Sequence, residues 1–185
     1  MESTHPAQLA DIERLVELAD SALAELSPLR GGRLWAVREK PPEPRKDEFL
    51  ATLGSAAALL QVGCIDGYPV GYGLVRGERL RTGEELAVVS DIYVEAPFRG
   101  VAVGEAVMDA LLDWARARGC IGVDSLVLPG MRDSKNFFER YGLKARALLV
   151  HRAFIEEEEE EEEEEENGAA DPERSSQASV GEVAR

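Results

Sequence analysis

The sequence has 185 residues, of which 44% are hydrophobic and 31% are charged, and it includes two cysteines and two histidines. This length and composition suit one domain with a substantial hydrophobic core plus a tail. No apolar run approaches the roughly 20 residues that span a bilayer, and the polar start is unlike a signal peptide, so we expect a cytoplasmic protein with no membrane partner.

The formal net charge of −15 is unevenly distributed along the chain. Eleven consecutive glutamates at residues 156–166 carry −11 of it, and residues 167–185 carry −1, which leaves −3 for residues 1–155. A near-neutral domain without a basic stripe is not expected to bind nucleic acid. The glutamates repel one another and bury nothing, so we predict a domain over residues 1–155 and a disordered acidic tail over residues 156–185.

The first half of the chain begins with helical patterns and continues with strand patterns. Apolar residues at helical spacing predict an amphipathic helix over residues 6–26, and shorter helices are expected at residues 34–37 and 47–53. Three apolar segments then predict strands, which are listed here by their bounds: 59–65, 70–76 and 86–94. An Asp66-Gly67 pair separates the first two strands and is typical of a tight hairpin.

The second half alternates helices and strands. The spacing predicts a helix over residues 104–118, a strand at 121–128, a short helix at 134–140 and a last strand at 147–154. A strand, a crossover helix and a second strand predict a parallel pair within an α/β sheet. The cysteines lie in or beside strands, which favours reduced thiols over a disulfide, and they show no metal-ligand spacing with the histidines.

The stretch that joins the strand at 86–94 to the helix at 104–118 is the most informative in the chain. Its loop, Arg99-Gly-Val-Ala-Val-Gly104, places small residues after an arginine. The N–H groups of a first helical turn have no intrahelical partner and point outward with the positive end of the helix dipole. Small side chains let an anion approach that backbone, and Arg99 adds a positive charge. The pattern therefore predicts a phosphate-binding loop.

This loop resembles the Arg/Gln-x-x-Gly-x-Gly/Ala pyrophosphate loop of the GNAT superfamily of acetyl-CoA-dependent N-acetyltransferases. The block Ser134–Leu143 is similar to that family's Ala-x-x-Phe-Tyr-x-x-x-Gly-Phe signature, and His5 to Asp11 resembles the usual start of such domains. Two blocks in the right order, each on the expected element, identify residues 3–154 as similar to GNAT domains of bacterial type. The resemblance implies a mixed α/β sheet of about six strands with flanking helices.

The resemblance also implies an activity, the transfer of an acetyl group from acetyl-CoA, as co-substrate, to an amine. The implied cofactor-binding residues are the strand residues Ile92, Tyr93 and Val94 for the pantetheine, the loop residues Arg99, Gly100, Val101, Ala102, Val103 and Gly104 for the pyrophosphate, and Ser134 and Phe138 for the far side. The alternative, from another class of protein, is an acyl-CoA-binding regulator or partner-binding module with weak or no catalysis.

Three positions depart from the family pattern. Ala102 replaces a loop glycine, and because alanine tolerates most loop conformations except a positive φ, we expect an intact loop. Phe138 stands where many members carry the tyrosine that protonates the leaving thiolate, so either the thiolate leaves unaided or another donor such as Tyr141 serves. Met131 stands where the family often has a cofactor-contacting asparagine.

The sequence leaves the identity of the general base open. Ser90 and Asp91 are the candidate catalytic residues, and Glu84 or Glu85 at the start of the same strand are others. Each has a structural alternative, since Asp91 can instead anchor a neighbouring loop by hydrogen bonds. The acceptor amine is not readable from the sequence.

The end of the domain suggests a hypothesis about assembly. Members of the family usually have a hairpin after the second block, whereas residues 144–155 leave room for one strand. An uncovered sheet edge is normally protected in proteins, and pairing of this strand with a second copy would protect it. A homodimer joined near Leu148 to His151 is one hypothesis, and a short strand guarded by basic residues is the other.

Overall fold

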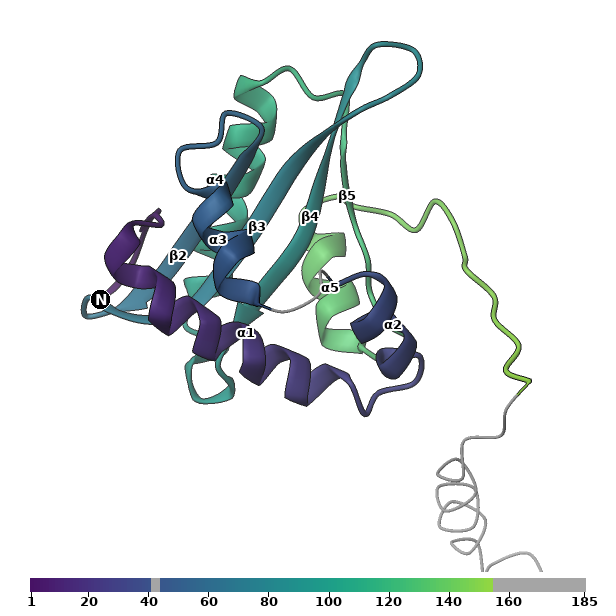
Figure 1. Cartoon of the computed structure of the whole chain (residues 1–185), viewed down its shortest axis with the longest axis horizontal. Helices are drawn as coiled ribbons and strands as arrows, with labels where there is room; N and C mark the ends of the chain where they lie inside the picture. Colours follow the sequence, from purple (N-terminus) through teal and green to yellow (C-terminus); the bar gives the residue numbers. More distant parts are fainter. Residues whose placement is uncertain (41–43, 155–185) are drawn as a thin grey trace, which may run out of the picture. The chain divides into compact units, whose positions relative to one another are not determined.

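The computed structural model describes residues 1–40 and 44–154, and the chain divides into two units, Met1–Lys144 and Ala145–Arg185. The first unit is a mixed α/β domain (Figure 1). The tail predicted at residues 156–185 lies outside the described residues. The helices and strands of the first unit are β1 (Glu2–Pro6), η1 (Leu9–Asp11), α1 (Ile12–Leu26), α2 (Gly32–Arg38), α3 (Arg45–Thr52), β2 (Ala58–Ile65), β3 (Tyr68–Arg79), β4 (Glu85–Val94), η2 (Ala96–Phe98), α4 (Val103–Ala117), β5 (Val123–Ser125) and α5 (Arg132–Arg140).

The predicted α/β class is confirmed, but the strand count and the last strand are wrong. The described sheet has five strands in the order β1-β2-β3-β4-β5, rather than about six, and residues 145–154 contain neither helix nor strand. A strand exists only when its backbone groups find a partner strand, and the outer strand β5 is three residues long. The strand expected at residues 147–154 is therefore not formed in the single chain. The dimer hypothesis, which takes the partner strand from a second copy, stays a prediction.

The sheet is antiparallel except for its last pair. Strand β5 runs parallel to β4 and matches residues 123–125 to residues 87–89, which confirms the parallel pair. The hairpin between β2 and β3 turns at Asp66 and Gly67, with φ values of 48° and 80°, as the Asp-Gly pair predicts.

Strand β1 is a difference from the sequence prediction, which placed residue 6 in a helix. Residues 2–6 pair antiparallel with β2, and the Thr4 hydroxyl donates to the Val62 carbonyl at 2.7 Å. The α-helix begins only at Ile12. The open edge of β2 thus recruits the N-terminal residues into the sheet, an effect that local periodicity does not reveal.

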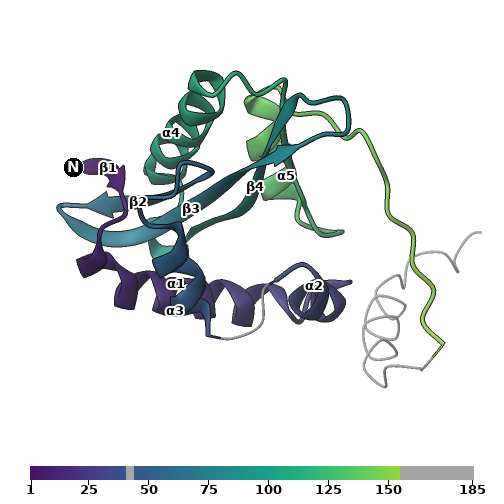
Figure 2. The same ribbon diagram turned by 45° about the horizontal axis from the view of Figure 1, so that its top comes forward.

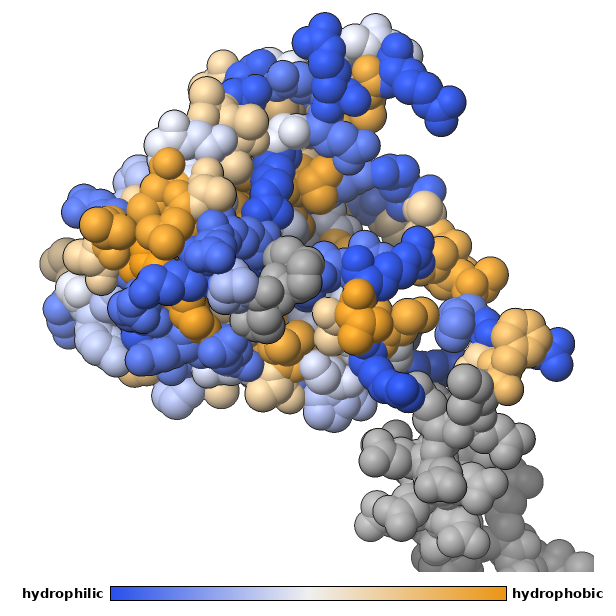
Figure 3. Space-filling model, in the orientation of Figure 1, coloured by the Kyte–Doolittle hydropathy of each residue, from blue (hydrophilic) through white to orange (hydrophobic). Residues whose placement is uncertain are grey.

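Helices cover both faces of the sheet (Figure 2). Helices α1 and α3 pack on one face around Leu15, Phe49 and Tyr72, and α4 packs on the other around Val107 and Leu111. Hydrophilic side chains predominate on the outer surface over α1, as its amphipathic sequence requires (Figure 3). Met108 and Leu112, which face away from the central stripe, are buried against Phe138 of α5.

Two glycines let α4 approach the sheet closely. A Cβ atom on Gly63 would lie 2.6 Å from a methyl group of Val103 and 2.8 Å from one of Val107. A Cβ atom on Gly73 would lie 2.7 Å from Val107. These distances are far below van der Waals contact, so the small residues determine where the start of α4 lies.

We expect Gly63→Ala to destabilise the domain by about 1–3 kcal/mol, because overpacking displaces α4. Urea unfolding followed by circular dichroism measures the change. Gly122→Ala is the matched control, since its Cβ would meet Leu86 at an ordinary 3.6 Å, and it should change stability by less than about 0.5 kcal/mol. Equal stabilities of the two variants would contradict the close packing.

Candidate functional site

The loop before α4 ends in a set of free backbone donors. Helix α4 begins at Val103, and no backbone N–H of residues 101–105 donates to another residue in the described part of the chain. The first intrahelical bond of this kind comes from Ala106, whose N–H donates to the Ala102 carbonyl at 3.0 Å. Gly104 lies in this first turn, and a Cβ there would still have ordinary contact distances to Phe137 and Val94. The arrangement is suited to binding an anion.

Ala102 differs from the sequence expectation, because it adopts a positive φ of 65° at the N-cap of α4. A left-handed conformation costs an ordinary L-residue about 1–2 kcal/mol. The loop therefore keeps the shape that a glycine would adopt, and the alanine carries the strain.

Replacing Ala102 with glycine should stabilise the domain by about 0.5–1 kcal/mol, since relief of strain exceeds the extra entropy of the unfolded glycine. Chemical unfolding measures this. In contrast, Ala106→Gly, in the regular part of the same helix turn, should destabilise by about 1 kcal/mol. A loss of stability in Ala102→Gly would show that the left-handed conformation is not strained.

Arg99 is held by the domain rather than pointing freely at the loop. Its Nε donates to the Val94 carbonyl at 2.8 Å, its Nη2 donates to Glu25 at 2.7 Å, and its guanidinium lies 5.5 Å from the centre of the Tyr93 ring. The hydrogen bond from Arg99 lowers the pKa of Glu25. Arg99 thus ties α1 to the end of β4 and places a positive charge beside the loop.

The edge of β4 that faces β5 is open over its second half. The register of β3 against β4 shifts so that Leu74 faces Asp91 and Val75 faces Val89, which makes Ser90 the extra residue of a bulge. A bulge bends its strand. Strand β5 pairs with β4 only as far as Val89, so no described strand adjoins Ile92–Val94 on that edge.

The two predicted site residues on α5, Phe138 and Ser134, differ in burial. Phe138 is 6% exposed and packs with Met108 and Leu112, in a cluster against which Ile92 also packs. Phe137, which the sequence analysis passed over, is the ring nearest to Gly104. The Tyr141 hydroxyl donates to the Glu105 carbonyl at 3.2 Å, and Ser134 lies half-buried in the first turn of α5.

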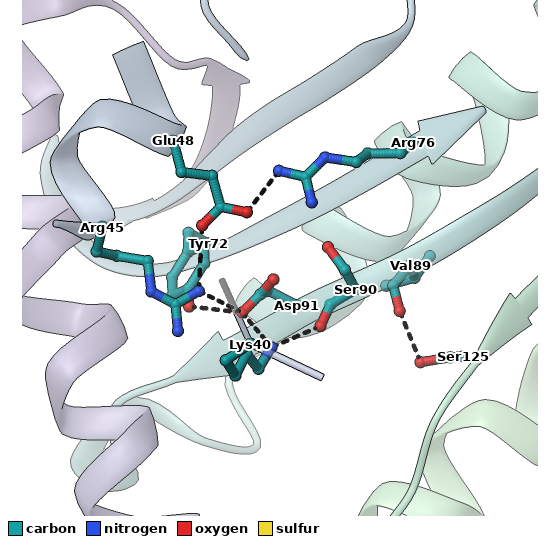
Figure 4. Close-up of polar contacts among 9 residues, drawn as sticks. All are labelled: Lys40, Arg45, Glu48, Tyr72, Arg76, Val89, Ser90, Asp91 and Ser125. Atoms are coloured by element: carbon teal, nitrogen blue, oxygen red, sulfur yellow. Dashed lines mark hydrogen bonds and ion pairs between the residues drawn. The ribbon is translucent and has the colours of Figure 1, made fainter. Parts of the chain in front are cut away.

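A buried cluster of charges on the α3 face of the sheet includes Asp91 (Figure 4). The Lys40 ammonium donates to Asp91 Oδ1 at 2.7 Å and to the Ser90 carbonyl at 2.8 Å. Arg45 lies 3.8 Å from the same carboxylate oxygen, and the Tyr72 hydroxyl donates to it at 3.2 Å. The side chains of Lys40 and Asp91 are each 7% exposed, so this is a buried ion pair.

The sequence analysis missed the cationic side of this cluster. Lys40 and Arg45 flank the proline-rich stretch at 41–44, and no spacing rule connects either residue with β4. Only the tertiary structure brings them to Asp91. The alternative reading of Asp91 as an anchor for a neighbouring segment matches these contacts.

The electrostatics of Asp91 follow from its partners. Burial raises the pKa of this carboxyl, but the charges of Lys40 and Arg45 and the hydrogen bond from Lys40 outweigh burial, so its pKa lies below the ordinary 3.8. Burial and the Asp91 charge raise the pKa of Tyr72 well above 10.0. The Ser90 Oγ is buried and has no hydrogen-bond partner among the described residues.

A surface pocket of about 290 Å³ adjoins the same cluster. It lies between α3, β2 and β3, and the ion pair of Glu48 with Arg76, 2.6 Å between Oε1 and Nη2, forms part of its wall. The pocket adjoins the half of the sheet that includes residues 87–88 of β4, whereas the loop follows the other end of that strand. The pocket and the loop are therefore separate features.

The described residues give no indication of a metal site, a membrane-spanning helix or a disulfide bond. Within residues 1–40 and 44–154, three or more potential metal ligands do not gather anywhere. No helix of that part is long and apolar enough to span a membrane. Both cysteines are free thiols, as expected.

Comparison with known proteins gives a family and a fold. A sequence profile of the Acetyltransferase (GNAT) family matches residues 23–143. No protein among those with curated descriptions matches the sequence.

Solved structures share the fold over most of the chain. A Bacillus halodurans protein superposes with a TM-score of 0.69 at 15% identity, over 83% of this chain and 99% of the other. A ribosomal-protein-alanine N-acetyltransferase from Brucella melitensis superposes with a TM-score of 0.61 at 20% identity, over 84% of this chain and 100% of the other. AAC(6')-Iy bound to a CoA-containing bisubstrate analogue superposes with a TM-score of 0.62 at 16% identity, over 83% of this chain and 97% of the other.

Proposed function

Because the chain belongs to the GNAT acetyltransferase family, we propose that it transfers an acetyl group from acetyl-CoA to an amine. The observation that carries the proposal is the row of free N–H groups at residues 101–105, together with the open edge of β4 at Ile92–Val94. The first surface suits a pyrophosphate, and the second suits an extended chain with amide groups. AAC(6')-Iy, which shares the fold, was solved with a CoA-containing analogue.

In this proposal, each predicted cofactor residue has a defined task. The backbone from Gly100 to Gly104 binds the pyrophosphate, and Arg99 supplies charge beside it. The backbone of Ile92–Val94 pairs with the pantetheine amides, and Phe138 and Ser134 contribute to the α5 side of the groove. The Arg99 hydrogen bond to Val94 must rearrange if that carbonyl is to accept a bond from the pantetheine.

The proposed reaction requires a neutral amine. Its nitrogen forms a bond to the thioester carbonyl carbon, the carbon–sulfur bond breaks, the sulfur leaves as a thiolate, and the nitrogen loses a proton. An alkylamine has a pKa near 10.4 and a thiol near 8.5, so the thiolate can leave without a phenol at Phe138.

We propose that Asp91 is not the general base. Its lowered pKa and its ion pair with Lys40 make Asp91 a weak proton acceptor, and the Ser90 Oγ has no hydrogen-bond partner among the described residues. The proton then leaves to water, and the acetylation rate should rise steadily between about pH 6 and pH 9.

Calorimetry with acetyl-CoA and a thiol-release assay over alkylamines, arylamines and amino sugars test the proposal. Binding with turnover of at least one class supports it, and absence of acetyl-CoA binding would contradict it. Binding without turnover of any amine would support the second candidate, an acyl-CoA-binding regulator, which the missing phenol at Phe138 favours.

Three further expectations belong to the same proposal. The catalytic domain spans residues 1–155 and acts in the cytoplasm. Acetyl-CoA and an amine are its partners. A homodimer stays a prediction, which light scattering at tens of micromolar protein tests.

A further inference from the structure

An ammonium group of the chain itself lies at the bulge of β4. The Lys40 Nζ contacts the Ser90 carbonyl at 2.8 Å and Asp91 Oδ1 at 2.7 Å (Figure 4). It also lies 4.7 Å from the centre of the Trp35 ring. A carbonyl, a carboxylate and an aromatic face are together the partners that suit an alkylammonium ion. We call Ser90, Asp91 and Trp35 the ammonium cage.

The cage lies where β4 and β5 separate. Val89 is the last β4 residue paired with β5, and the carbonyl of the next residue, Ser90, accepts the Lys40 ammonium. From Val94, next to the loop, to Ser90 the strand covers about 13 Å. A pantetheine that follows this edge back from the pyrophosphate therefore brings its thioester toward the cage.

We infer that the ammonium cage is the subsite for the acceptor, that it binds a primary ammonium at the end of an unbranched alkyl chain, and that Lys40 fills it as an internal substitute. The bound ammonium loses one proton to water before its nitrogen attacks the thioester carbonyl carbon. This inference rests on the proposed acetyl transfer. Lysine side chains, diamines and simple alkylamines all carry this group. Amines on aromatic rings and amino-sugar rings do not.

The shape of the occupant supports this class. The Lys40 side chain ends in four methylene groups and an ammonium, and it is 7% exposed. A slot that holds such a chain with both oxygen partners in hydrogen-bond range is matched to a linear alkylamine. An acceptor must displace Lys40, so the lysine also lowers the apparent affinity for the acceptor.

Two variants of Lys40 distinguish the effect of emptying the space that its side chain fills from the effect of removing its charge. Lys40→Ala removes three methylene groups and the ammonium, which together have the outline of n-propylammonium, whereas Lys40→Met removes the charge and keeps the slot filled. Both leave Asp91 without its lysine, so they share the same electrostatic loss. The probe is n-propylammonium chloride, with n-propanol as the neutral control of the same shape.

We expect n-propylammonium at ten times its Kd to raise the Tm of full-length Lys40→Ala by about 4 °C. It should have no such effect on Lys40→Met, and n-propanol should have none on either. If Lys40→Ala is unfolded in buffer, n-propylammonium should restore its near-ultraviolet circular dichroism. A folded Lys40→Ala that does not respond, or a response shared by Lys40→Met, would overturn the cage.

The acceptor role has its own readout. With acetyl-CoA, Lys40→Ala should acetylate n-propylamine about tenfold faster than Lys40→Met. Putrescine and a blocked lysine derivative then distinguish the diamine and peptide sources, and aniline should not react. Stabilisation without acetylation, in a protein that binds acetyl-CoA and acetylates another amine, would overturn the acceptor role. Failure to bind acetyl-CoA would instead count against the proposed function.

Discussion

Replacing Gly104 with valine is expected to weaken acetyl-CoA binding by about a hundredfold or more while the domain stays folded. The proposed pyrophosphate site consists of the free N–H groups of residues 101–105. Hydrogen bonds to a charged group contribute about 1.5–3 kcal/mol each, so the loss of two accounts for this factor. The branched side chain would stand in the first turn of α4, where the anion must approach the backbone.

Gly104→Ala is the matched control for this prediction. Its Cβ would lie 3.7 Å from both Phe137 and Val94, which is ordinary contact, so the fold accommodates it. Calorimetry should show affinity within about tenfold of the wild type for alanine and a large loss for valine. Unchanged affinity in a folded Gly104→Val protein would remove the loop from the proposed site.

The substitution Asp91→Asn is expected to destabilise the domain by about 3–5 kcal/mol at pH 7. It leaves the buried ammonium of Lys40 without its anionic partner and weakens the pairing of Arg45. Urea unfolding measures the loss. Asp113→Asn is the control, because its pair with Arg116 is 76% and 70% exposed, and it should change stability by less than about 1 kcal/mol.

The same pair of proteins tests the pH dependence. The folded-state pKa of Asp91 lies below its ordinary 3.8, so the carboxylate stabilises the fold above that pH. This contribution should disappear as the pH falls below 3.8 and through the lowered pKa. The stability difference between wild type and Asp91→Asn should therefore be constant near neutrality and shrink in acid. A difference that grows in acid would contradict the lowered pKa.

The loop at residues 99–104 could be predicted because it depends on local chemistry. Small residues between a strand and a helix are visible in the sequence, and so are the hairpin at Asp66-Gly67 and the central stripe of α4. The positive φ of Ala102 could not be predicted, since alanine avoids that region unless the surrounding strand and helix impose it.

The charged part of the candidate site depends on contacts between distant segments. Lys40 and Asp91 are 51 positions apart, and their pairing follows from how the segment after α2 reaches β4. The burial of Met108 and Leu112 likewise requires α5, which covers a second side of α4. Such contacts leave no periodic signal in either segment.

By itself, the sequence determined the α/β class, the order of most elements and the loop of small residues before α4, because periodicity and turn residues act over a few neighbouring positions. Only the tertiary structure decided that residues 2–6 pair with β2, that residues 147–154 form no strand, and that Lys40 fills the cage at the bulge of β4. A strand or a buried ion pair gains its stability from a partner far away in the chain, and that partner is chosen when the sheet and its helices assemble.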